Sequence, residues 1–168
     1  MPSKKLFRVG RSRTGLGLFA TEPIKKRAFI VEYTGRRLTT AQAEKLEARN
    51  ARYLYEINSR WTIDGKSRRN LGRYANHSCR PNAESDTIRG KKVILRAIKN
   101  IKPGEEITYS YGSDYFDVYL KPVGCKCTKC IEKRREARRI TRAKAKARAR
   151  RKQKNGAHPK AGSGDRAP

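Results

Sequence analysis

The chain has 168 residues, of which 43 are Lys or Arg and 15 are Asp or Glu, so its formal net charge at pH 7 is +28. A charge this large indicates polyanionic surroundings such as nucleic acid or nucleoprotein, and solubility is the simpler alternative. No run of about 18 apolar residues is present and charged residues interrupt the N-terminus, so we expect no membrane span, no signal peptide and an intracellular protein.

The composition changes near residue 130. Every aromatic residue precedes residue 120, and residues 131–168 contain only Ile131 and Ile140 as large apolar side chains. Residues 1–130 hold 28 Lys or Arg against 12 Asp or Glu, and residues 131–168 hold 15 against 3. A segment so basic and so poor in apolar side chains buries no core of its own. We therefore expect a folded part followed by a basic appendage.

Short apolar runs bounded by glycine and charged residues predict most of the secondary structure. The expected strands are Leu6–Val9, Ala28–Tyr33, Tyr53–Ile57, Trp61–Ile63, Val93–Ile98 and Ile107–Tyr111. Turn signals at Arg89-Gly90 and Pro103-Gly104 keep consecutive strands close in sequence, which favours antiparallel pairing. The fold is therefore expected to be mainly β.

Two segments favour helix. Thr39 with Gln42 three residues later matches a capping box, and Ala41–Ala51 is rich in helix formers. Residues 131–153 also have high helix propensity, but the positive charges between 142 and 152 repel one another. We expect disorder in this tail, with folding on a polyanion, and flexibility over residues 155–168.

A glycine-rich string, Gly15-Leu16-Gly17-Leu18-Phe19-Ala20, fits the dinucleotide-binding fingerprint, so a nicotinamide oxidoreductase is one alternative. That fingerprint opens a helix and needs an acidic residue about 20 positions later. Here Pro23 and a new strand follow directly, and Glu32 comes too early, which disfavours this function. The other two interpretations are a plain turn and a loop whose glycines let the backbone approach a compact charged ligand.

The four cysteines are Cys79, Cys125, Cys127 and Cys130. The last three lie within six residues, too close for relaxed disulfides among themselves, and an intracellular compartment keeps thiols reduced. Four thiolates suit a tetrahedral structural zinc that is closed to water. Free cysteines are the alternative.

Six motifs follow one another in order: Gly15–Ala20, Glu32–Gly35, Ile63–Gly65, Asn70–Asn82, Gly104–Gly112 and Cys125–Cys130. The fourth contains Asn-His-Ser-Cys-Arg-Pro-Asn. Together they resemble the SET-domain protein lysine methyltransferases with a post-SET-like zinc-binding cysteine cluster. The resemblance implies an S-adenosylmethionine-dependent protein-lysine N-methyltransferase. It also implies a SET fold of several small curved sheets, one or two short helices, and a C-terminal segment threaded as a pseudoknot beneath the loop of Asn76 and His77.

The resemblance divides the chain into a SET catalytic domain over 1–116, a post-SET-like zinc-binding segment over 117–133 and a basic, disordered tail over 134–168. It implies that Tyr111, Tyr33 and Tyr109 are catalytic, with Tyr111 orienting the amine. It implies cofactor binding by Gly15, Leu16, Gly17, Arg73, Asn76, His77 and Tyr111, and zinc binding by Cys79, Cys125, Cys127 and Cys130. The chain departs from the family pattern in a shorter Cys-x-Cys-x2-Cys spacing and in Arg36, where an acidic residue is usual.

Methyl transfer to lysine requires a deprotonated amine, whereas a lysine in water is protonated at pH 7. An aromatic channel and the neighbouring sulfonium both lower the lysine pKa. The resemblance implies that the hydroxyl of Tyr109 restricts the channel, so mono- or dimethylation is expected.

The expected substrate is a lysine in a flexible basic segment, such as a histone, a DNA-packaging protein, a ribosomal protein or the chain's own tail. Nucleic-acid contact through the tail is expected, on chromatin in a nucleus or in a bacterial nucleoid according to the host. A non-catalytic, zinc-stabilised nucleic-acid-binding module with a SET-like fold is the alternative function.

Overall fold

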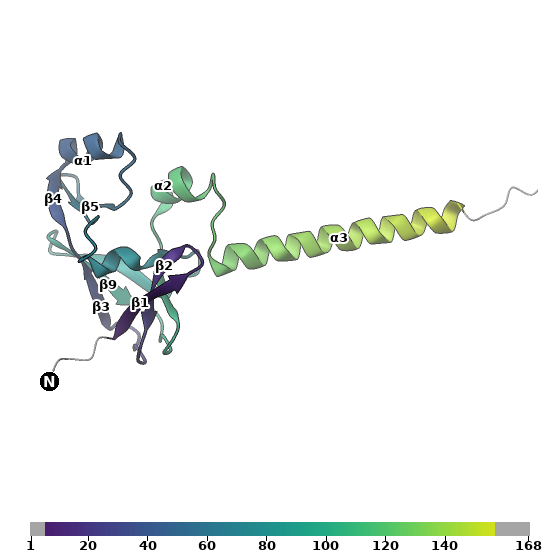
Figure 1. Ribbon diagram of the computed structural model, residues 1–168, viewed down its shortest axis with the longest axis horizontal. Coiled ribbons are helices and arrows are strands. Elements are labelled where there is room, and N and C mark those ends of the chain that lie inside the picture. Colours follow the sequence, from purple (N-terminus) through teal and green to yellow (C-terminus); the bar gives the residue numbers. More distant parts are fainter. Residues whose placement is uncertain (1–5, 157–168) are drawn as a thin grey trace, which may run out of the picture. The chain divides into compact units, whose positions relative to one another are not determined.

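The computed structural model describes residues 6–156, and the chain divides after Cys130 into a larger N-terminal and a smaller C-terminal unit. The larger unit is mainly β, as predicted, and is built from three small sheets (Figure 1). The first has the order β1 (Phe7–Ser12), β2 (Gly15–Ala20), β10 (Glu106–Tyr109) and β7 (Asn76–His77). The second is β3 (Phe29–Tyr33), β9 (Lys92–Ala97) and β8 (Ala83–Ile88), and the third is β4 (Arg36–Thr39), β6 (Trp61–Asp64) and β5 (Leu54–Asn58).

The six predicted strands correspond to β1, β3, β5, β6, β9 and β10, with shifts of at most three residues at their ends. Four further strands were not predicted: β2, β4, β7 and β8. The two glycines of β2 disfavour a strand in isolation, and β8 is polar at Glu84, Ser85 and Asp86. Pairing with neighbouring strands supplies what these segments lack in intrinsic propensity.

Strand β10 positions the site because it lies between two segments that are distant in sequence. It pairs antiparallel with β2, where Ile107 is opposite Leu18, and parallel with β7, where Tyr109 is opposite His77. Its side chains Ile107 and Tyr109 belong to the main hydrophobic core, in which Leu18, Leu95 and Ile101 are at most 1% exposed. The packed core therefore fixes the backbone on which the candidate site stands.

The helices of the larger unit are short. The predicted capping box begins α1 (Thr40–Glu47), where the Thr39 N–H donates to Gln42 Oε1 at 3.0 Å. Helix α1 contacts β4 and β6, and Figure 1 shows it next to β4. A 3-10 turn, η1 (Leu71–Tyr74), precedes β7, and α2 (Ser113–Tyr115) continues into a π-helical turn, η2 (Phe116–Leu120).

The helix α3 (Thr128–Gly156) contains most of the basic tail. Residues 134–156, for which the sequence predicted disorder, are therefore helical in this structure. Alternating Ala, Lys and Arg have high helix propensity, and Arg139 donates two hydrogen bonds of 2.9 Å to Glu136 one turn earlier. The flexibility predicted for 157–168 lies outside the described residues. Along residues 6–156, no helix combines the length and apolarity needed to cross a membrane.

Candidate active site and cysteine cluster

Two pockets meet at β10. Glu106 and Thr108 line the first pocket, whereas Tyr109, Ser110 and Tyr111 line the second, so the same strand forms a wall of both. We call the first the Asn76 pocket; its cavity volume is about 400 Å³. We call the second the tyrosine groove; its volume is about 930 Å³. No residue lines both cavities.

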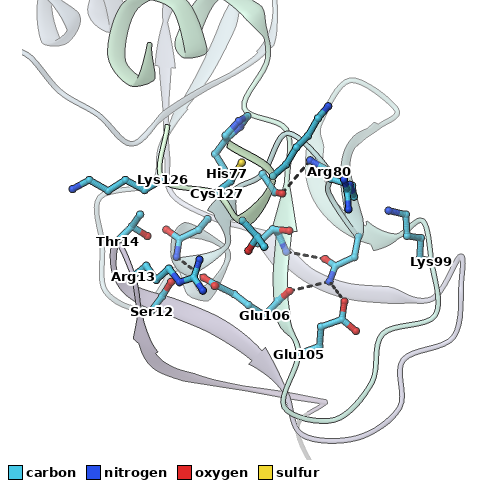
Figure 2. Close-up of a pocket in the computed structure, with 16 residues that line it drawn as sticks. Ser12, Arg13, Thr14, His77, Arg80, Lys99, Glu105, Glu106, Lys126 and Cys127 are labelled. Atoms are coloured by element: carbon cyan, nitrogen blue, oxygen red, sulfur yellow. Dashed lines mark hydrogen bonds between the residues drawn. The ribbon is translucent and has the colours of Figure 1, made fainter. Parts of the chain in front are cut away.

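The Asn76 pocket is built from segments far apart in the chain (Figure 2). It is lined by Ser12, Arg13, Thr14, Asn76, His77, Ser78, Arg80, Asn82, Lys99, Glu105, Glu106, Thr108, Lys126, Cys127, Thr128 and Lys129. The Asn76 side chain donates to Glu106 Oε1 at 2.8 Å and to the Leu16 carbonyl at 3.0 Å. A Cβ on Gly17 would lie 2.5 Å from Glu106 Oε1 and 2.9 Å from Ser12 Cβ. Glycine at position 17 is thus required for this arrangement.

Asn82 lines the Asn76 pocket and connects Glu105, Glu106 and Thr108. Its side chain is buried, donates to Glu105 Oε1 at 3.0 Å and to the Glu106 carbonyl at 2.8 Å, and accepts from the Thr108 N–H at 2.8 Å. The sequence predicted no functional role for Asn82, Glu105 or Glu106. The only signal available was that Asn82 ends the Asn-His-Ser-Cys motif and that the two glutamates begin the Tyr109 strand.

His77 connects the tyrosines to the cysteines. Its Nδ1 accepts the Tyr111 backbone N–H at 3.2 Å, and its Nε2 lies 3.3 Å from Cys79 Sγ. An accepting Nδ1 assigns the proton of the neutral ring to Nε2, which then donates to the sulfur. Burial lowers the His77 pKa, which agrees with a neutral ring at pH 7. His77 also contacts Tyr111 ring to ring, with centroids 5.4 Å apart.

The four cysteine sulfurs form one cluster, all within 4.8 Å of one another. The Cys79 sulfur is 3.6 Å from that of Cys130 and 4.0 Å from that of Cys125. Burial raises the pKa of Cys79 and of Cys125. Burial acts the same way on Cys127, but backbone hydrogen bonds from Cys79 and Cys130 outweigh it and lower the Cys127 pKa to about 7. Four convergent sulfurs, one of which is readily ionised, could hold a metal ion despite the shortened spacing.

Six tyrosines line the tyrosine groove: Tyr33, Tyr53, Tyr55, Tyr109, Tyr111 and Tyr115. Ring centroids lie 4.9 Å apart for Tyr109 and Tyr111 and 5.1 Å apart for Tyr111 and Tyr115. Burial raises the pKa of Tyr33, Tyr109 and Tyr111, so their hydroxyls stay neutral. A wall of aromatic faces and neutral hydroxyls disfavours an ammonium relative to an amine.

The hydroxyls of the three predicted catalytic tyrosines are in different situations. Tyr111 donates to the Ala75 carbonyl at 2.9 Å, and Tyr33 donates to the Tyr53 carbonyl at 3.0 Å. Tyr109 is 7% exposed, and its hydroxyl has no hydrogen-bond partner among the described residues. The Tyr109 hydroxyl is thus the one of the three that remains available to an occupant of the tyrosine groove.

The structure separates the predicted cofactor-binding residues. Asn76 and His77 line the Asn76 pocket, and Gly17 packs behind it, while Tyr111 lines the tyrosine groove. Arg73 also lies in the tyrosine groove, with its guanidinium 3.9 Å from the Tyr53 ring centre and donating to the Lys66 carbonyl.

The glycine string contributes less directly than the sequence suggested. Gly15 and Leu16 line neither pocket, and Leu16 contributes only its carbonyl, to Asn76. The turn before them, Ser12 to Thr14, lines the Asn76 pocket instead. Backbone groups at a turn carry no residue signature, so the sequence could not identify them.

Comparison with known proteins identifies relatives of this arrangement. Residues 15–112 match the family model described as SET domain. The chain is 38% identical over 134 residues to Histone-lysine N-methyltransferase set-2 of Caenorhabditis elegans, which is 74% of this chain and 9% of that relative. It is 37% identical over 118 residues to Histone-lysine N-methyltransferase, H3 lysine-4 specific, of Schizosaccharomyces pombe, which is 64% of this chain and 13% of that relative. The chain therefore spans only a small part of the length of these relatives.

Solved structures show the same fold. A crystal structure of an active polycomb repressive complex 2 in the basal state superposes with a TM-score of 0.58 at 30% identity, over 67% of this chain and 16% of that one. A structure of ctPRC2 in an autoinhibited conformation, bound to S-adenosylmethionine, gives a TM-score of 0.57 at 30% identity, over 66% and 15%. The small-sheet SET fold expected from the motifs is thereby confirmed.

Proposed function

Because the chain belongs to the SET domain family, we propose that it is an S-adenosylmethionine-dependent protein-lysine N-methyltransferase. The observation that carries this proposal is the shared wall at β10. A polar pocket around Asn76 and His77 lies against one part of the strand, and a tyrosine-lined groove lies against the next. Such a wall brings two reactants together from two separate cavities.

The Asn76 pocket is the proposed site of the methyl donor. S-adenosylmethionine, when bound, would supply a methyl group attached to a positively charged sulfur, and this sulfur would be the leaving group when the lysine Nζ takes the methyl group. The residues present fit such a ligand: Glu105 and Glu106 offer carboxylates beside a cationic group, and Arg13, Lys126 and Lys129 offer partners for a carboxylate. The ctPRC2 structure bound to S-adenosylmethionine supports this assignment by homology.

The tyrosine groove is the proposed site of the substrate lysine. The rings of Tyr33, Tyr109 and Tyr111 exclude water and favour the neutral amine, which is the nucleophilic form. We assign to Tyr111 the orientation of that amine, because its ring lies between Tyr109 and His77. We assign mono- or dimethylation, because the free hydroxyl of Tyr109 can hold a water that occupies the space of a further methyl group.

The cysteine cluster is the proposed site of one structural Zn²⁺, held by Cys79, Cys125, Cys127 and Cys130. Bound there, zinc cross-links the segment that contains Asn76 and His77 to the segment 125–130. Lys126, Cys127, Thr128 and Lys129 of that segment line the Asn76 pocket, so the cross-link would complete the pocket wall.

The proposed substrate is a lysine in a basic protein of the histone or DNA-packaging kind, and the proposed location is chromatin or a nucleoid. Two features support it: the names of the relatives refer to histone lysines, and the chain has a net charge of +28. The basic helix α3 is the proposed nucleic-acid contact, since residues 131–168 hold 15 Lys or Arg against 3 Asp or Glu.

The decisive experiment is methyl transfer from labelled S-adenosylmethionine to a histone mixture, a nucleoid-protein extract and the chain itself, with Tyr111→Phe as the comparison. The zinc-loaded protein should label lysines, and the variant should lose at least about 100-fold in rate while keeping its fold. Absence of labelling by folded, zinc-loaded protein on every substrate would favour the non-catalytic nucleic-acid-binding module instead.

A further inference from the structure

The tyrosine groove is acidic although the protein is strongly basic. Five carboxylates line it: Glu44, Glu47, Glu56, Glu84 and Asp114. Only two basic side chains do so, Arg52 and Arg73. The whole chain, by contrast, has 43 basic residues and 15 acidic ones. The groove therefore has a charge opposite in sign to that of the chain around it.

Four of these carboxylates have no partner among the residues that the structure describes. Among residues 6–130, every other carboxylate makes an ion pair, a hydrogen bond or another electrostatic contact: Glu22, Glu32, Asp64, Asp86, Glu105, Glu106, Asp114 and Asp117. Glu44, Glu47, Glu56 and Glu84 make none, and all four are exposed. Within residues 6–130, where Lys and Arg side chains are abundant, unpaired carboxylates confined to one groove indicate a cationic partner from outside.

The two arginines of the groove do not neutralise it. Arg73 stacks on Tyr53 and donates to the Lys66 carbonyl, and Arg52 lies over the Tyr119 ring at 5.6 Å. Neither forms an ion pair with a groove carboxylate among the described residues. Arg36, which stands where an acidic residue is usual in the family pattern, lines neither pocket.

A second and independent feature points to a ligand in the same groove. Tyr109 is 7% exposed and lines the groove, and its hydroxyl lacks a hydrogen-bond partner in the described part of the chain. This hydroxyl is not sealed from solvent, so it reaches the space of the groove and can hydrogen-bond an occupant that carries a polar group. The aromatic part of the groove thus suits one polar group, and the exposed carboxylates suit further cations.

We propose that the groove recognises Lys or Arg residues flanking the target lysine, and that Glu44, Glu47, Glu56 and Glu84 are the specificity-determining residues. This inference rests on the proposed function of the groove and names its substrate class. The carboxylates come from three elements, α1, β5 and β8. An extended peptide advances about 3.3 Å per residue, so several of its side chains can meet carboxylates at once. The same carboxylates repel phosphate, which excludes nucleic acid from the groove.

The test is peptide binding by fluorescence anisotropy with the full-length, zinc-loaded protein and no methyl donor. Three labelled peptides share one central lysine and differ only in their flanking residues, which are Arg, Gln or Glu. The Arg peptide should bind about tenfold or more tightly than the Gln peptide, and the Glu peptide most weakly. This preference should shrink as salt rises from 50 mM to 500 mM, since the contacts are exposed and the screening length falls from about 14 Å to about 4 Å over that range.

Substitution assigns the effect to the groove. Each of Glu44→Gln, Glu47→Gln, Glu56→Gln and Glu84→Gln should weaken Arg-peptide binding by about twofold to fivefold and leave Gln-peptide binding unchanged. Asp117→Asn is the matched control: it removes one exposed carboxylate that lines neither pocket and pairs with Lys121 four residues later. In turnover, the glutamine variants should raise KM for the Arg peptide with kcat unchanged.

Equal binding of the Arg and Gln peptides, or an equal effect of Asp117→Asn, would overturn the inference. Failure of the two proposals can be told apart. Charge-dependent binding without methyl transfer would refute the enzyme alone, and methyl transfer without flank preference would refute only the specificity.

Discussion

Gly17 determines whether three side chains of the Asn76 pocket can meet. A Cβ there would push on Glu106 Oε1 and Ser12, and Glu106 is the acceptor for Asn76. Gly17→Ala should therefore weaken S-adenosylmethionine binding about tenfold, which corresponds to one lost hydrogen bond of about 1.4 kcal/mol. The unfolding temperature should fall by only a few degrees. Titration calorimetry of the variant measures the affinity.

Leu16→Ala is the matched control for this prediction. The Leu16 side chain is 50% exposed and only its carbonyl contacts Asn76, so the affinity should stay within about twofold of that of the unchanged protein. Equal affinities for Gly17→Ala and the unchanged protein would show that Asn76 and Glu106 do not shape the donor site.

Tyr109 offers a second prediction, on the products. Tyr109→Phe removes a hydroxyl without a partner, so the stability should be unchanged or slightly higher. The vacated space and the lost water site should move the products from mono- and dimethyl-lysine toward trimethyl-lysine. Mass spectrometry of a methylated peptide measures the distribution. Abundant trimethyl product from the unmodified protein would contradict the assigned role of Tyr109.

Residues inside a contiguous motif were predictable, and residues assembled from several strands were not. From the sequence, Asn76 and His77 could be assigned to cofactor binding and Cys79 to zinc binding, because all three lie within a single Asn-His-Ser-Cys string. Glu44, Glu56 and Glu84 share no motif, since α1, β5 and β8 are brought to one groove only by the sheets. A carboxylate in an isolated sequence cannot be told from any other solvated charge.

At the scale of elements, the segment 125–130 supplies both cysteines and pocket wall. We predict about one zinc per chain, and removal of zinc by a chelator should lower the unfolding temperature by several degrees and abolish S-adenosylmethionine binding. The sulfur of Cys79 contacts those of Cys125 and Cys130 at 4.0 and 3.6 Å, and such sulfur contacts are much weaker than bonds to a shared metal ion. Calorimetry before and after chelation measures both effects.

Zinc add-back is the control for the chelator, because it restores the fold only if metal loss caused the change. Cys127→Ser should reproduce the chelated state, since it removes the most acidic thiol of the cluster. Metal analysis that finds no zinc in reduced, unchelated protein would remove the metal from the proposed function.

The strands that the sequence did not predict share one physical cause. Strands β2 and β8 have glycines or polar runs that lower their intrinsic strand propensity, and they form because β10 and β9 lie beside them.

In α3, helix propensity and charge repulsion oppose each other. Repulsion among Lys and Arg predicted disorder, but Ala-rich spacing and the pair of Glu136 with Arg139 favour helix. Helix propensity and charge repulsion act in opposite directions here, and a count of charges gives the size of neither effect.

At the scale of the whole molecule, charge is divided between two tasks. Residues 131–168 hold 15 basic residues against 3 acidic ones, which suits a polyanion, whereas the tyrosine groove is acidic and suits a basic peptide. A protein that binds nucleic acid through one unit and a basic protein through the other would act on proteins that are themselves bound to nucleic acid.

Deletion of residues 131–168 tests this division, since the chain divides after Cys130. Duplex DNA binding should weaken and its salt dependence should flatten, because each lost phosphate contact reduces the slope of log K against log salt by about 0.9. Binding should not vanish, as residues 1–130 still hold 28 basic residues against 12 acidic ones. Turnover of a short Arg-flanked peptide should stay within about twofold, because every described residue that lines either pocket falls within 12–129. A full-length variant with the Lys and Arg of 142–152 changed to Gln controls for chain length, and should reproduce the loss of DNA affinity. The Gln variant removes positive charge from the tail but keeps the chain itself, whereas the deletion removes both. If the deletion lost peptide turnover and the Gln variant kept it, the tail would contribute structure to the catalytic unit.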